Sequence, residues 1–369
     1  MRRSLGLLAA AAGGLLTLAA GIAVDMDAAP LDQPYRASVA CNDDYESLPR
    51  GCQPQACGRA VFDNVITSEE AASLRAMADE ALAFAARKAG HDLPHGWNTP
   101  GQTPLPLLDG PSIVDVNTGF ARHSVLGLQG LYRDLGKKRK PTTERFVLNQ
   151  LHRTLYQRVG RTLESLLTSE FGLSELHFSA PTFVARLQGS AAWRARDVHD
   201  EYWHPHVDRV STQGARTPCA VTMATASLPL PRAMVRRHIW VGWHGMLANN
   251  TAHYHYSALL YLAEGGGEDF SGGEFQFMDP EGNFTVVPRA GRVVIFTSGQ
   301  EHLHRVRPVT QGVRYAISMW FTCDAAMAMP QFLDGKMHNT FHAKREAGKK
   351  RQRRHLPRNH RVKAPKDEL

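Results

Sequence analysis

Outside its C-terminal end, the chain has no excess of either charge. The sequence of 369 residues carries a formal net charge of +8. Residues 344–369 contain 11 lysines and arginines and 3 acidic residues, which leaves 32 residues of each sign in the other 343. A body without a basic excess gives no charge-based indication of nucleic-acid binding, so no nucleic-acid partner is expected. Residues 325–369 lack a hydrophobic period, and we expect this basic tail to be largely disordered.

Cysteine is scarce, and the spacing of the five cysteines does not match a zinc site. Cys52 and Cys57 are separated by four residues rather than two, and no second close pair exists, so structural zinc is not expected. We instead expect one or two disulfides, formed mainly within the group Cys41, Cys52 and Cys57, in an oxidising compartment. Cys219 and Cys323 lie far downstream, and one of the five cysteines should remain a free thiol.

The two ends of the chain carry targeting signals. Residues 1–3 include two arginines, and residues 4–24 form an uncharged stretch, as in a secretory signal peptide or a single-pass type II signal anchor. The last four residues, Lys366-Asp367-Glu368-Leu369, match the signal that the endoplasmic-reticulum retrieval receptor binds. We therefore expect a lumenal protein of the endoplasmic reticulum, either soluble or membrane-anchored. Asn249 and Asn283 stand in sequons that could be glycosylated there.

Two amphipathic helices are predicted in the first half of the chain. Thr67 and Glu70 have the spacing of a capping box, and the apolar period that follows them continues to Gly90. A second apolar stripe should begin near Thr143 and end at Gly172. Both stripes indicate helices that pack against a sheet.

From Leu176 onward the pattern changes to short strands rich in β-branched and aromatic residues. About eight such strands with turns between them are typical of a jelly-roll, the double-stranded β-helix. Together with the supporting helices, they predict an α+β fold. The expected strands are 182–187, 203–207, 257–262, 274–278, 284–287, 292–296, 303–306 and 314–321.

These observations divide the chain into four parts. The parts are the targeting segment 1–24, the cysteine-containing segment with the supporting helices at 25–175, the jelly-roll domain at 176–324, and the basic tail at 325–369. The domain contains an insertion at about 212–252, which could be a lid over a binding site or a disordered loop.

His206 and Asp208 form the motif from which a functional site can be argued. On a strand, side chains two residues apart point the same way, so one metal ion could bind both. His304 would complete a set of two histidines and one carboxylate, which suits Fe(II) and leaves coordination positions open. Arg314 follows ten residues later, and its guanidinium can bind a carboxylate through two parallel hydrogen bonds.

Other histidines compete for a metal, and three of them with a bound water would suit a zinc hydrolase. Strand alternation predicts that His204 and His302 face away from an ion held by His206 and His304. A zinc hydrolase would also give no reason for Arg314. The remaining competitors are His199, His253 and His255.

The motifs together resemble the Fe(II)- and 2-oxoglutarate-dependent dioxygenases of the prolyl 4-hydroxylase type. More narrowly, residues 199–208, 296–299 and 303–306 resemble the 2-oxoglutarate and iron-dependent oxygenase domain-containing protein 3 family. The resemblance covers roughly residues 41–324, apart from the insertion. It implies that the jelly-roll domain is the dioxygenase domain.

The resemblance also implies a set of roles. His206, Asp208 and His304 would bind Fe(II), while Arg314 and Tyr261 would bind the distal carboxylate of the co-substrate 2-oxoglutarate. No catalytic residue is implied beyond the metal ligands, and ascorbate is implied as a further cofactor. The expected reaction hydroxylates a C–H bond, by analogy on a protein or peptide substrate. A non-catalytic metal-binding scaffold of the same fold is the alternative.

Overall fold

The computed structural model describes residues 25–27, 29–99, 105–132, 144–179, 182–195, 204–209 and 251–329. The predicted targeting segment, the basic tail with its retrieval signal, and residues 212–250 of the insertion lie outside these ranges. His199, Cys219 and Asn249 also lie outside them. Within the described ranges, no helix combines the length and apolar character needed to span a bilayer.

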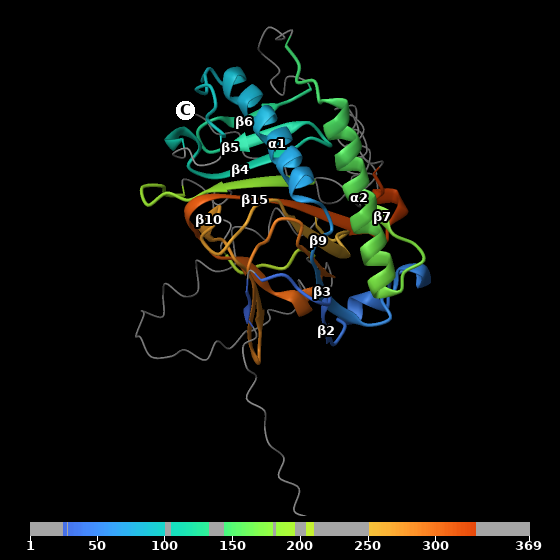
Figure 1. The fold of residues 1–369 in the computed structure, drawn as a ribbon. Coiled ribbons are helices and arrows are strands. Elements are labelled where there is room, and N and C mark those ends of the chain that lie inside the picture. Colours follow the sequence, from blue (N-terminus) through green and yellow to red (C-terminus); the bar gives the residue numbers. More distant parts are fainter. Residues whose placement is uncertain are drawn as a thin grey trace, which may run out of the picture.

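Two β-sheets form the centre of the fold (Figure 1). The larger sheet has the order β2-β3-β13-β9-β15-β8-β4-β5-β6, with the short strands β7 and β10 also paired to β15. The smaller sheet has the order β1-β12-β11-β14. Among the described residues, all strand pairings are antiparallel except the one between β1 and β12. The predicted jelly-roll is confirmed.

The larger sheet comprises β2 (Tyr35–Val39), β3 (Cys57–Phe62), β4 (Gly110–Asp115), β5 (Phe120–His123), β6 (Gly127–Gly130), β7 (His177–Phe178), β8 (Phe183–Gln188), β9 (Tyr256–Tyr261), β10 (Phe270–Gly272), β13 (Val293–Thr297) and β15 (Val309–Thr322). The smaller sheet comprises β1 (Asp25–Met26), β11 (Phe275–Asp279), β12 (Gly282–Val286) and β14 (His304–Val306).

Helices α1 (Ser68–Lys88) and α2 (Gln150–Phe171) pack on one face of the larger sheet (Figure 1). The capping box of Thr67 and Glu70 is present at the start of α1, as predicted. Gly172 ends α2 in the left-handed conformation, with φ of 67°, also as predicted. The predicted start of α2 near Thr143 was wrong, because the side chain of Asn149 accepts a hydrogen bond from the Leu151 backbone and caps the helix there.

The strand β9 shows how alternation divides the core into two layers. Leu260 packs in the cluster that faces the helices, whereas Leu259 and Tyr261 pack in the cluster between the two sheets. Phe275 and Phe277 of β11 fill that second cluster from the smaller sheet. Aromatic side chains from both sheets therefore fill the space between the two sheets.

Seven of the eight predicted strands are confirmed with boundaries shifted by a few residues, from β8 to β15. The exception is 203–207, where the described residues 204–209 pair at the single bridge formed by His206. The strands β2 to β6, which precede residue 176, were not predicted. They are short, and β4 begins with Gly110 and Pro111, residues that normally indicate a turn.

The disulfides confirm one half of the cysteine prediction and correct the other. Cys41 pairs with Cys57 inside the N-terminal group. Cys52 pairs with Cys323, which lies 271 residues away in the sequence and just after β15. The prediction that disulfides form mainly within the N-terminal group was therefore wrong for Cys52, because spacing along the chain does not report distance in the fold.

We predict that the double variant Cys52→Ser/Cys323→Ser loses more stability than Cys41→Ser/Cys57→Ser. A disulfide restricts the unfolded chain more when it closes a longer loop, and removing one typically costs about 2–5 kcal/mol. Denaturant unfolding of both variants and the wild-type chain under oxidising conditions measures the two losses. Equal losses, or a larger loss for the short loop, would show that loop length does not govern the contribution of these disulfides.

Candidate metal centre and co-substrate site

The structure brings His206, Asp208 and His304 together. One ligand atom from each lies within 4.8 Å of the other two, and this is the one such group of three among the described residues. Oδ1 of Asp208 is 3.8 Å from Nε2 of His304. The ring centroids of the two histidines are 4.4 Å apart. Two imidazoles and one carboxylate at these distances fit an Fe(II) ion.

Backbone pairing fixes the position of the two histidines. The His206 N–H donates to the His304 carbonyl at 2.8 Å, and the His304 N–H donates back to the His206 carbonyl at 2.9 Å. Residues directly opposite in an antiparallel pair carry their side chains on the same face, so both rings project toward one point. Strand alternation was expected to place Asp208 beside His206. That reason was wrong, because Asp208 lies in a bend and not in a strand.

Each histidine also has a fixed orientation of its ring. Nδ1 of His206 lies 2.8 Å from the carbonyl oxygen of His204, and Nδ1 of His304 lies 2.8 Å from the carbonyl oxygen of His302. A carbonyl oxygen only accepts, so Nδ1 carries the hydrogen in both rings and Nε2 presents its lone pair. This is the tautomer that binds a metal through Nε2.

Burial favours the neutral form of His304. The side chain is 3% exposed, and burial lowers the pKa of His304 to about 4, with His206 acting in the same direction and Asp208 opposing it. A neutral imidazole is the form that can donate a lone pair to a cation. Aromatic rings enclose it on one side, with centroids at 4.9 Å for Phe275 and 5.2 Å for Phe296.

Arg314 lies on the same inner face of the larger sheet as this aromatic cluster. It is 2% exposed, and its Nε donates to the carbonyl oxygen of Gly273 at 2.9 Å. Its guanidinium carbon is 5.3 Å from the centroid of the Tyr261 ring. Tyr261 in turn packs with Phe275 and Phe296, the rings that contact His304. The arginine and the metal ligands therefore border one hydrophobic cluster.

The hydroxyl of Tyr261 is buried, and it forms no hydrogen bond within the usual distance and angle limits to a described residue. Burial raises the pKa of Tyr261 to about 12, and the positive charge of Arg314 opposes that shift. A hydroxyl that stays protonated at neutral pH, next to a buried guanidinium, makes an environment suited to a carboxylate. Arg314 and Tyr261 thus fit the distal carboxylate of 2-oxoglutarate.

The competing histidines that the structure describes do not join the group of three. His302 lies in a 3-10 turn (Gln300–His302), and its Nδ1 is 2.8 Å from the Thr297 carbonyl oxygen. This turn, rather than strand alternation, keeps His302 out of the group of His206, Asp208 and His304. His255 accepts a hydrogen bond from the Cys323 backbone at 2.9 Å, which uses its Nδ1. His253 is half-buried, and the loss of water around it lowers its pKa to about 4.

Comparison with known proteins gives three findings. Residues 195–322, which include His206, Asp208, His304 and Arg314, match the model of the 2OG-Fe(II) oxygenase superfamily. The 2-oxoglutarate and iron-dependent oxygenase domain-containing protein 3 of Xenopus tropicalis is 34% identical over 295 residues, which span 79% of this chain and 71% of that protein. Prolyl 3-hydroxylase 2 of Mus musculus is 26% identical over 272 residues, 72% of this chain and 30% of that protein.

Among solved structures, the chain is similar to a prolyl hydroxylase from Trichoplax adhaerens in complex with a hypoxia inducible factor oxygen degradation domain peptide fragment. The identity is 13% and the TM-score is 0.37, over 72% of this chain and 83% of that chain.

The fold and the matched domain define the class as Fe(II)- and 2-oxoglutarate-dependent dioxygenases. Within that class, the chain belongs to the 2-oxoglutarate and iron-dependent oxygenase domain-containing protein 3 family. It is an enzyme that uses Fe(II) and 2-oxoglutarate. The zinc hydrolase and the non-catalytic scaffold are therefore not retained.

We predict that Gly273→Ala destabilises the protein more than Gly267→Ala. Both glycines have positive φ, 71° and 99°, where a Cβ costs about 1–2 kcal/mol. A Cβ on Gly273 would lie 2.8 Å from Cδ of Arg314, 2.9 Å from Val309 and 3.0 Å from Phe270, whereas the nearest atom to one on Gly267 is 3.8 Å away. Denaturant unfolding of the two variants separates the cost of crowding these three side chains from the cost of the backbone conformation. Equal losses would mean that the turn moves without displacing the side chains around it.

Proposed function

We propose that this dioxygenase hydroxylates a C–H bond of a polypeptide, using Fe(II) bound by His206, Asp208 and His304. The observation that carries the assignment is the meeting of these three side chains within 4.8 Å. The bound iron would supply the oxidising chemistry. The protein's own contribution is to hold two Nε2 atoms and one carboxylate oxygen on one side of the ion.

Arg314 and Tyr261 are proposed to hold the co-substrate. A guanidinium forms paired charge-assisted hydrogen bonds with a carboxylate, and the Tyr261 hydroxyl adds a neutral donor. Because the two side chains border the aromatic cluster that also encloses His304, a short dicarboxylate could be bound by the arginine at one end and face the metal at the other. Ascorbate is proposed as the reductant that keeps the iron in its Fe(II) state.

A protein or peptide substrate, with proline as the first residue to test, is supported by the similarity to prolyl 3-hydroxylase 2. We further propose that the enzyme works in the lumen of the endoplasmic reticulum. The two disulfides support an oxidising compartment. The signal-like N-terminus and the Lys366-Asp367-Glu368-Leu369 tetrapeptide support retention there through the retrieval receptor. In that compartment the exposed Asn283 of β12 is a candidate glycosylation site.

Asp208→Ala and His304→Ala are predicted to abolish oxygen-dependent conversion of 2-oxoglutarate to succinate. Each variant removes one of three metal ligands, so the affinity for Fe(II) should fall as well. Succinate release with oxygen uptake measures the first effect, and equilibrium dialysis against Fe(II) under anaerobic conditions measures the second. His253→Ala is the matched control, since this half-buried histidine lies outside the group, and its removal should leave metal binding intact. Full metal binding by Asp208→Ala would contradict the ligand assignment.

Arg314→Ala is predicted to weaken 2-oxoglutarate binding without loss of Fe(II). Hydrogen bonds to charged groups contribute about 1.5–3 kcal/mol, which corresponds to a roughly 10- to 100-fold higher dissociation constant. Arg314→Lys should recover part of the loss, because lysine keeps the charge but not the two-bond geometry. The charge-transfer band of the anaerobic Fe(II)–2-oxoglutarate complex gives the binding curve. An unchanged curve for Arg314→Ala would remove this arginine from the co-substrate site.

A further inference from the structure

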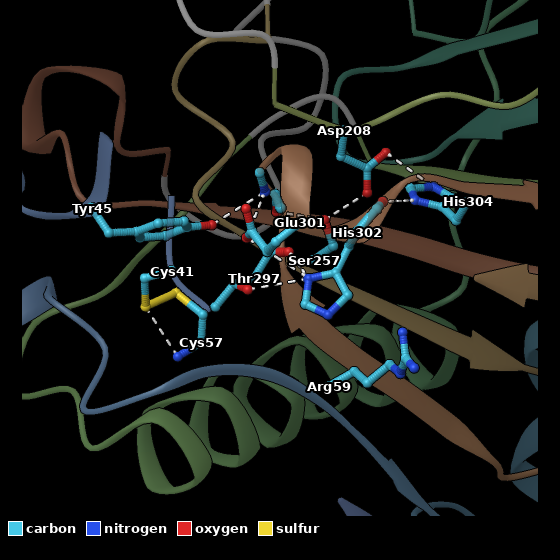
Figure 2. A network of polar contacts seen from close by, with 12 residues as sticks. Cys41, Tyr45, Cys57, Arg59, Asp208, Ser257, Thr297, Glu301, His302 and His304 are labelled. Carbon is cyan, nitrogen blue, oxygen red and sulfur yellow. Dashed lines mark hydrogen bonds and ion pairs between the residues drawn. A yellow bond between two sulfur atoms is a disulfide. The ribbon is translucent and has the colours of Figure 1, made fainter. Parts of the chain in front are cut away.

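The second carboxylate oxygen of Asp208 has a buried partner that sequence analysis did not identify. Ser257 of β9 donates a hydrogen bond from its Oγ to Oδ2 of Asp208 at 2.6 Å (Figure 2). Ser257 is 3% exposed. The bond therefore forms where water competes little for the carboxylate, and where a hydrogen bond to a charged group is strong.

A second serine extends this contact into a chain of hydroxyls. Oγ of Ser298 lies 2.6 Å from Oγ of Ser257, and Ser298 is fully buried. A hydroxyl has one hydrogen to donate, and Ser257 gives its hydrogen to Asp208. Ser298 must then donate to Ser257, so both hydrogen bonds point toward the carboxylate. Aligned bonds of this kind polarise one another.

The backbone holds Ser298 at a fixed distance from both of its neighbours. The Ser298 N–H donates to the carbonyl of His255, just before β9, at 3.1 Å. The Ser298 carbonyl accepts from the N–H of Arg209, the residue after Asp208, at 2.8 Å. The hydroxyl chain and the bend that carries Asp208 are thus tied to the same point between β13 and β14.

The hydrogen bond from Ser257 orients the carboxylate of Asp208, so that its other oxygen faces the proposed metal position. With Oδ2 bonded to Ser257, Oδ1 is the oxygen near Nε2 of His304, at 3.8 Å. A carboxylate that binds through one oxygen occupies one coordination position. A two-histidine, one-carboxylate site needs a carboxylate that binds through one oxygen, because the co-substrate and oxygen need the remaining coordination positions.

We propose that Ser257, supported by Ser298, is a positioning residue that presents Asp208 to the metal through Oδ1 alone. The inference rests on the proposed metal-binding role of His206, Asp208 and His304. It assigns to the carboxylate the kind of support that the two histidines receive from the carbonyls of His204 and His302. All three ligands then have a second partner that fixes their orientation.

The test compares Co(II) binding by the wild-type chain, Ser257→Ala, Ser257→Thr and Ser298→Ala. Loss of an orienting partner typically costs about 10- to 100-fold in metal affinity, and we expect a loss of that size for Ser257→Ala. Ser257→Thr keeps a hydroxyl and should recover most of the affinity. Ser298→Ala should lose less than Ser257→Ala, because the direct bond to Asp208 remains. The visible spectrum of the Co(II) complex should change in Ser257→Ala and not in Ser257→Thr.

Ser112→Ala provides the matched control for loss of a buried hydroxyl. Ser112 is fully buried on β4 of the same sheet, opposite Arg186 on the face covered by the helices. It should leave Co(II) affinity unchanged. Unfolding of the metal-free proteins completes the comparison, since a merely structural serine would lower stability without changing the Co(II) spectrum of the folded protein.

The outcomes separate the two levels of the proposal. Wild-type affinity and spectrum in Ser257→Ala, with a wild-type chain that binds Co(II), would overturn the positioning role and leave the ligand assignment in place. A wild-type chain whose Co(II) binding is insensitive to Asp208→Ala would overturn the proposed function and the positioning role together. An affinity loss in Ser257→Ala that Ser257→Thr restores would support both.

Discussion

The pair of backbone hydrogen bonds between His206 and His304 is the constraint on which the metal centre depends. His304 belongs to β14, which stands at the end of the smaller sheet and offers backbone groups without a strand beyond it. Residues 204–209 use those groups at one position, and this single bridge aligns two rings that are 98 residues apart in the sequence. The bend at Asp208 starts from this bridge, and the backbone bond from Arg209 to Ser298 fixes its other end.

The sequence alone named His206, Asp208 and His304, which the structure brings together, but part of the geometric reasoning was wrong. The spacing of His206, Asp208, His304 and Arg314 depends on residue type and order, which a sequence displays directly. The geometric reason offered for Asp208 was wrong, since a bend and the Arg209–Ser298 backbone bond place it rather than a continuous strand. Residues that meet in the fold can therefore be named from their chemistry before their local structure is known.

The parts that sequence analysis missed depend on partners far away in the chain. Ser257 and Ser298 are two serines among many, and only the pairing of β9 with β13 places their hydroxyls 2.6 Å apart. Strand β3 pairs with β2 on one side and, across more than 200 residues of sequence, with β13 on the other. Local propensity does not predict such contacts, because they join residues far apart in the sequence. The helix caps at Thr67 and Gly172 depend on neighbouring residues and were predicted.

Tyr45, near the start of the described chain, contacts the backbone beside the proposed metal centre. The hydroxyl of Tyr45 donates to the His255 carbonyl at 3.1 Å and accepts from the Gly299 backbone at 3.2 Å. Burial, and then the charge of Glu301, hold the pKa of Tyr45 well above its usual value, so the hydroxyl keeps its proton and continues to donate at neutral pH. Tyr45 thereby joins His255, just before β9, to Gly299, which follows Ser298.

The Cys52–Cys323 disulfide links the same region covalently. Cys52 follows Tyr45 by seven residues, and its carbonyl accepts a hydrogen bond from the Tyr256 hydroxyl at 2.8 Å. Cys323 donates its backbone N–H to His255, whose carbonyl is the acceptor for both Tyr45 and Ser298. The hydrogen bonds of Cys323, Tyr45 and Ser298 thus meet at His255, the first at its ring and the other two at its carbonyl. Because that carbonyl fixes Ser298, and Ser298 donates toward Ser257 and Asp208, the rigidity of the metal ligand is built from residues at both ends of the folded domain.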